Sequence, residues 1–83
     1  MIWFISTRQP DDTYPSVGRA DRTVWRDMSP LSAQAAARRL TRLSGGAIKA
    51  EGYYDDRPYA DHPVQTFYSE HGVIVPVRRE NGQ

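Results

Sequence analysis

SPLSAQAAARRLTRLSGG, residues 29–46, carries the one clear helix signal in the sequence, and the other elements are interpreted around it. Ser29 suits the cap of the first turn, and Pro30 suits the first helical position, where its missing N–H has no partner to lose. Gly45 and Gly46 supply the left-handed residue that commonly ends a helix. We therefore expect a helix bounded by these residues, with strands and loops on both sides of it.

The apolar residues of this helix predict which side packs on a sheet. At about 100° per residue, one stripe should face inward, and it consists of Ala33, Ala36, Ala37, Leu40 and Leu43. The opposite face should be exposed, and it consists of Leu31, Ala35, Arg38, Arg39 and Arg42. That outward face is basic and carries no acidic residue, so it is the strongest candidate for a partner-binding surface.

Five further segments are typical of β-strands, and they are residues 1–7, 22–28, 47–54, 64–70 and 73–78. The first is a continuous apolar run, which favours a central strand buried on both faces. His71–Gly72 favours a tight hairpin, and Pro76 places the last strand at a sheet edge because proline cannot donate to a ladder. We expect an α+β fold of order β-β-α-β-β-β: a two-layer domain in which one helix packs on one face of an antiparallel sheet of four to five strands.

Core positions can be predicted in two of the expected strands, by alternation in one and by side-chain size in the other. In residues 47–54, Ile48 and Ala50 should face inward, and the residues that should face outward are Lys49, Glu51 and Tyr53. Trp25 is interpreted as a core residue rather than a stacking platform, because small cores need large aromatic side chains.

The long connection at residues 8–21 contains two prolines and a glycine. Connections of this length are usually functional or disordered, and the sequence leaves the role of this one open. Tyr14 and Val17 are the residues expected to anchor it to the core.

Length and composition limit the class of protein. With 83 residues we expect a single domain, residues 1–83, whose core buries about 60–65% of the surface of the unfolded chain, and residues 79–83 are expected to form a disordered tail. The absence of cysteine excludes disulfides and thiolate metal sites and favours an intracellular setting. The apolar run at residues 2–5 is too short for a signal peptide or a membrane span, so we expect a cytoplasmic protein without membrane contact.

The net charge of +1 conceals an asymmetry along the chain. Residues 1–46 contain seven arginines and four aspartates, whereas residues 47–83 contain four basic and six acidic residues. Ten of the eleven basic residues are arginine, which fits either a GC-rich genome or a need for the planar guanidinium group in binding phosphates and carboxylates. Composition does not separate these two explanations.

The sequence contains no strong signature of a metal-binding or catalytic site. Oxygen and imidazole ligands for a divalent ion occur together at Asp55, Asp56, Asp61 and His62. Their spacing matches no ligand motif, and these residue types are also ordinary in turns. No serine or threonine lies in a nucleophile elbow, Gly45–Gly46 is not a phosphate loop, and His71 has no orienting partner that can be inferred. We expect no metal, no cofactor and no enzyme activity.

Two surfaces remain as candidates for binding. Repulsion among Arg38, Arg39 and Arg42 costs a few tenths of a kcal/mol, and the helix dipole offsets it by a comparable amount, so helix stability does not explain why these arginines are there. The second surface is a set of tyrosines at Tyr53, Tyr54, Tyr59 and Tyr68. Tyrosine and arginine are enriched at binding hot spots, so Tyr53 and Tyr59 join the outward helix face in the candidate site.

The chain resembles small phage-encoded anti-CRISPR proteins in three features. These are an apolar first strand from Met1, a serine-led and alanine-rich helix ending in glycine, and a closing hairpin, FYSEHGVIV, at residues 67–75. The resemblance is one of size and element order over most of the chain, and it transfers no functional residues. It implies a non-enzymatic inhibitor that binds a host CRISPR surveillance complex and blocks its DNA targeting. Because the chain lacks the acid excess of DNA mimics, a contact with a protein surface or with crRNA fits better.

Two alternatives to this function follow from the residues themselves. One is a small nucleic-acid-binding module in which the helix arginines contact phosphates, and its affinity would fall steeply with salt. The other is a metal-dependent hydrolase centred on residues 55–62, which has the least support.

Overall fold

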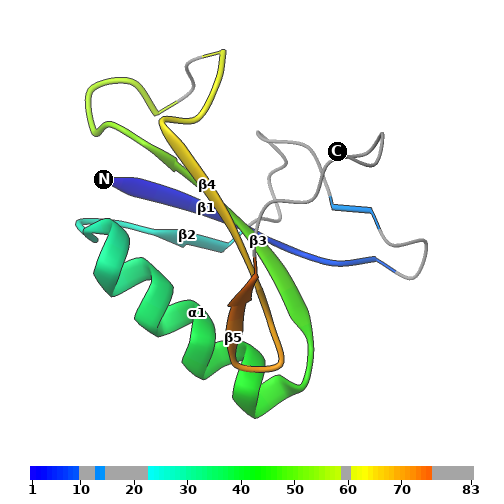
Figure 1. The fold of residues 1–83 in the computed structure, drawn as a ribbon. Helices are drawn as coiled ribbons and strands as arrows, with labels where there is room; N and C mark the ends of the chain where they lie inside the picture. The colour runs from blue at the N-terminus through cyan, green and yellow to red at the C-terminus, as the bar shows by residue number, and fades with distance from the viewer. Residues whose placement is uncertain (10–12, 15–22, 59–60, 76–83) are drawn as a thin grey trace.

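One helix and five strands make up the part of the chain that the computed structural model describes, which is residues 1–9, 13–14, 23–58 and 61–75. The elements are β1 (Ile2–Thr7), β2 (Thr23–Trp25), α1 (Pro30–Ser44), β3 (Ala47–Tyr53), β4 (Gln65–Glu70) and β5 (Val73–Val75). The strands form one antiparallel sheet in the order β2-β1-β3-β4-β5, and α1 packs on one face against β3, β4 and β5 (Figure 1). The α+β class and the element order predicted from the sequence are confirmed.

The strand predictions are confirmed in their positions and corrected in their lengths. β1 is central and its apolar residues are buried, as expected. The strand expected at residues 22–28 ends at Trp25, because Asp27 adopts a φ of 58°, which is incompatible with an extended strand. β5 lies at the sheet edge, as Pro76 indicated, while Pro76 itself, Val17 and the expected tail at residues 79–83 lie outside the described residues.

Both ends of α1 form as the sequence predicts. The Ser29 hydroxyl accepts a hydrogen bond from the Ser32 N–H at 3.2 Å, and Pro30 occupies the first helical position. At the other end Gly45 adopts a φ of 71°, and its N–H donates to the Thr41 carbonyl at 2.8 Å. These caps satisfy backbone groups that the helix leaves without intrahelical partners.

The rotation of α1 about its axis differs from the prediction. The residues buried against the sheet are Ala33, Ala37 and Thr41, which we call the small-residue seam. Ala36 is only half-buried, and 41% of Leu40 and 78% of Leu43 are exposed, so the prediction that these two leucines enter the core is wrong. The physical reason is volume: the sheet already fills the core with Trp3 and Phe67, so the helix contributes small side chains there.

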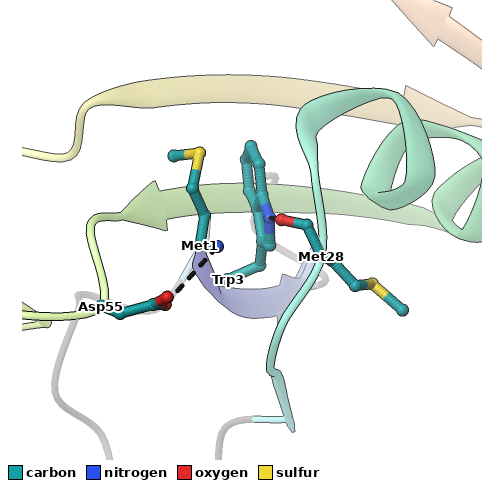
Figure 2. A network of polar contacts seen from close by, with 4 residues as sticks. All are labelled: Met1, Trp3, Met28 and Asp55. Carbon is teal, nitrogen blue, oxygen red and sulfur yellow. Dashed lines mark hydrogen bonds and ion pairs between the residues drawn. The ribbon is translucent and has the colours of Figure 1, made fainter.

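Trp3 is the centre of the core between sheet and helix. Its ring is fully buried and lies 5.4 Å from that of Phe67, centroid to centroid. Figure 2 shows its indole Nε1 donating to the Met28 carbonyl at 3.0 Å, which ties β1 to the segment that enters α1. The Met1 ammonium group lies 3.4 Å from an Asp55 carboxylate oxygen, so the segment after β3 contacts the N-terminus of the chain (Figure 2).

Two neighbours complete the surroundings of Trp3. Trp25, opposite Trp3 in the β1–β2 register, is half-buried against the same core, which confirms its interpretation as a core residue. Gly52 lies opposite Trp3 on β3, and a Cβ added there would lie 2.6 to 2.8 Å from three atoms of the indole ring. A side chain at position 52 would therefore force the Trp3 ring or the β3 backbone to shift.

The face of the sheet away from α1 is also buried at β1 and β3. Tyr53 is opposite Ile2 in the register and packs edge-on against Phe4, with ring centroids 5.5 Å apart. Glu51 is buried as well, and its carboxylate lies 3.6 Å from the Lys49 ammonium group. These residues face away from the helix as alternation predicted, but the expectation that Glu51 and Tyr53 are exposed is wrong, because this face of the sheet carries a second cluster of buried residues, Ile2, Phe4 and Tyr53.

A hydroxyl cluster joins α1 to the β4–β5 hairpin. The Thr41 hydroxyl donates to the Ala37 carbonyl at 3.0 Å and is hydrogen-bonded to the Ser69 hydroxyl at 2.9 Å. It also accepts from the Gly72 N–H at 2.9 Å, so one buried oxygen connects the helix, β4 and the hairpin turn.

Thr41→Val is expected to lower the free energy of unfolding by roughly 1–3 kcal/mol, because the Ser69 hydroxyl and the Gly72 N–H lose their partner with little change in shape. Thr41→Val/Ser69→Ala should cost less than the sum of the two single substitutions, since the stranded hydroxyl is then removed. Urea denaturation of the four proteins measures this coupling. Strictly additive costs would show that the hydroxyl pair contributes nothing.

Candidate binding surface on helix α1

The outward side of α1 carries the residues that the sequence analysis singled out. We define the basic face as Leu31, Ala35, Arg38, Arg39 and Arg42, and all five are exposed. The face is set by the rotation of the helix: with the small-residue seam against the sheet, positions about half a turn away point to solvent. This part of the predicted site is therefore brought together on one surface.

Within the described residues, the arginines of the basic face have no acidic ion-pair partner. Among the described residues, ion pairs join Met1 to Asp55, Arg8 to Glu70, and Lys49 to Glu51, and none of them involves the basic face. The first turn of α1 contains no acidic residue, and Arg42 lies in the last turn. Three exposed arginines thus share one helix surface.

Exposed leucines accompany these arginines. Leu31 on the basic face is 78% exposed, as is Leu43 one residue after Arg42, and Leu40 is partly exposed. Sequence reasoning missed Leu40 and Leu43 as surface residues because it assigned them to the core. Burying a leucine fully is worth about 1.5–3 kcal/mol, so leucines left in water beside cations are available to a partner.

The β4–β5 hairpin borders the basic face at its C-terminal end. His71 and Gly72 adopt φ values of 51° and 86°, as in a tight two-residue turn, and the His71 N–H donates to the Gly46 carbonyl at 3.1 Å. A Cβ added at Gly72 would lie 3.0 Å from the Arg42 Cβ, so the turn is close against the helix. The end of α1 that carries Arg42 is therefore held by the hairpin.

The tyrosines do not form the second surface in the described residues. Tyr53 is 1% exposed and belongs to the core, so its assignment to the binding site is wrong. Tyr68 is half-buried with its ring 5.3 Å from that of Tyr14, which confirms Tyr14 as a packed residue of the long connection. Tyr54 is exposed, and Tyr59 lies outside the described residues.

The candidate metal ligands between residues 55 and 62 do not form a metal centre within the described part of the chain. Asp55 contacts the Met1 ammonium group, and no three histidine, aspartate or glutamate side chains among the described residues lie together as metal ligands would.

The helix of the described chain is too short and too polar to span a bilayer.

The chain was compared with protein-family models, curated proteins and solved structures, and none of them matches it.

Proposed function

We propose that this chain is a non-enzymatic interaction protein that binds its partner through the basic face of α1. The observation that carries the proposal is the set of three exposed arginines, for which the described residues supply no ion pair. Guanidinium groups suit carboxylate and phosphate partners, because their planar donors bind such groups in pairs. The small-residue seam supports the proposal further, since it leaves the larger side chains of α1 outside the core.

The narrower form of this proposal is an inhibitor of the anti-CRISPR type, encoded by a phage or mobile element and acting in the host cytoplasm. It would bind a host CRISPR surveillance complex, a ribonucleoprotein, and block its DNA targeting. Its support is the resemblance in size and element order, together with a basic face suited to carboxylates or to crRNA phosphates. Addition of the protein to a purified surveillance complex, followed by measurement of target-DNA binding, tests this form directly.

A second candidate function is a nucleic-acid-binding module, and the same arginines favour it. If phosphates are the ligands, affinity for naked DNA or RNA should fall steeply between 50 and 200 mM salt, because each neutralised phosphate releases counterions. An affinity for nucleic acid that is absent, or insensitive to salt, removes this candidate.

Arg38→Glu/Arg42→Glu is expected to leave the fold intact and to weaken partner binding by about a hundredfold, because charge reversal turns attraction into repulsion. Both side chains are exposed, so folding loses mainly a weak dipole contribution. The measurement is affinity capture from the native host with mass spectrometry, followed by calorimetric titration of the identified partner and circular dichroism of the variant.

The matched control is Arg26→Glu/Arg57→Glu, which changes the net charge equally at two exposed arginines outside α1. This control should bind like the wild type. Equal losses in both double variants would show that net charge, rather than the basic face, determines binding, and a folded Arg38/Arg42 variant of unchanged affinity would remove the face from the site.

A further inference from the structure

We propose that the partner presents an acidic amphipathic helix to the flank of α1, where it packs on a leucine row formed by Ala36, Leu40 and Leu43. The inference rests on the proposed function, because it specifies what the basic face and its flank recognise. It adds to that function an apolar contact surface and a definite partner chemistry, namely leucine-like side chains flanked by carboxylates.

The leucine row has the spacing of a helix–helix seam. Its members are separated by four and then three residues, which is the repeat by which two helices interlock their side chains. At about 100° per residue they lie within about 60° of arc, between the small-residue seam and the basic face. Ala36 is half-buried, Leu40 is 41% exposed and Leu43 is 78% exposed, so the row becomes more accessible toward the C-terminal end of α1.

The arginines border this row on its outer side. Arg39 lies about 40° of arc from Leu43, and Arg42 follows about 60° further round the helix. A partner helix packed along the row therefore places its flanking positions near these two guanidinium groups. Carboxylates at those positions would form charge-assisted hydrogen bonds with them.

Charge selects this occupant over two others. A second copy of the chain would bring one basic face toward another, and like charges across an interface are unfavourable. A nucleic acid would supply phosphates to the arginines but would leave Leu40 and Leu43 in water. An acidic amphipathic helix satisfies the cations and covers the leucines together.

The test is a selection from displayed helical peptides against the full chain. The library holds an alanine-rich 20-residue helix in which seven positions on one side vary among leucine, glutamate, lysine, glutamine and serine. The expected pool has leucine at three–four spacing with glutamate beside it. Leu40→Ser/Leu43→Ser should weaken binding of the selected peptides at least tenfold, whereas Arg39→Glu/Arg42→Glu should shift the flanking preference from glutamate to lysine.

The control variant is Val64→Ser, an exposed apolar residue outside α1, which should bind the selected peptides like the wild type. If the double leucine variant melts early, Leu43→Ser alone serves, because that side chain is mostly exposed. The proposal is overturned by a selection without enrichment, by a pool lacking acidic residues, or by peptides that bind the leucine variants equally well.

Titration of the native partner distinguishes failure of this inference from failure of the proposed function. A native partner released by Arg38→Glu/Arg42→Glu but bound normally by Leu40→Ser/Leu43→Ser overturns the inference and leaves the proposed function standing. A native partner that binds both variants normally overturns both. Salt-sensitive binding to a DNA duplex that ignores the leucine substitutions would replace the acidic helix with a nucleic acid.

Discussion

Ala37→Asp is expected to leave the domain unfolded at 25 °C. Ala37 is fully buried in the cluster that contains Trp3 and Phe67, so aspartate would place a charge and extra volume where no partner exists among the described residues. The penalty for burying an unpaired ion is several kcal/mol, and an 83-residue domain at about 0.05–0.15 kcal/mol per residue has a similar total stability. The measurement is circular dichroism with a thermal melt, in which the cooperative transition should be absent.

Ala35→Asp is the matched control, because it makes the same substitution two residues away on the exposed side of α1. Its cost should be close to the difference in helix propensity, about 0.7 kcal/mol or less. Leu40→Asp, at a half-exposed position, should cost about 1–2 kcal/mol and lower the melting temperature by roughly 4–16 °C. A folded Ala37→Asp protein alongside an unfolded Leu40→Asp protein would show that α1 is rotated away from the orientation described above.

Gly52→Ala is expected to lower the free energy of unfolding by about 1–3 kcal/mol, and Gly52→Val by more, because overpacking displaces neighbours from their preferred positions. The added Cβ would lie within 2.8 Å of three Trp3 ring atoms, and the indole is enclosed by the core and held by its hydrogen bond to Met28. Urea denaturation at 25 °C measures the loss.

Two comparisons isolate the contact with Trp3. Gly46→Ala should be close to neutral, since its Cβ would meet only the Ser44 hydroxyl at 3.4 Å. In a Trp3→Phe background, Gly52→Ala should cost less than in the wild type, because the smaller ring leaves room for the methyl group. If the cost is the same in both backgrounds, the indole is not what excludes a side chain at position 52.

The ends of the helix and its rotation were not equally predictable. Capping depends on residues adjacent in the chain, so Ser29, Pro30 and Gly45 were interpreted correctly from the sequence alone. Rotation depends on the volume that the sheet leaves free, which requires knowledge of how Trp3 and Phe67 pack. An apolar stripe scored by hydrophobicity favours leucine over threonine, so the prediction placed Ala33 and Ala37 correctly in the core but added Leu40 and Leu43 and left out Thr41.

The exposure of the charged residues in the candidate site could be predicted from the sequence, but the exposure of its tyrosines could not. Arginines without acidic neighbours on one helix face were correctly expected at the surface. Tyr53 was misplaced because alternation gives the face on which a side chain lies but not whether that face is covered. The close approach of Trp3 to the β3 backbone could have been predicted from Gly52, since glycine inside a strand often marks the close approach of another group.

The small-residue seam has a consequence for how this fold can be changed. Side chains that hold α1 to the sheet and side chains that point outward belong to separate sets along the same 15 residues. The five positions of the basic face can be rewritten, by mutation or by design, at little cost to folding, because all five are exposed. Variants that differ only at these positions, with the small-residue seam, Ala36 and Leu40 kept constant, should therefore give families of binders with different targets and nearly equal melting temperatures.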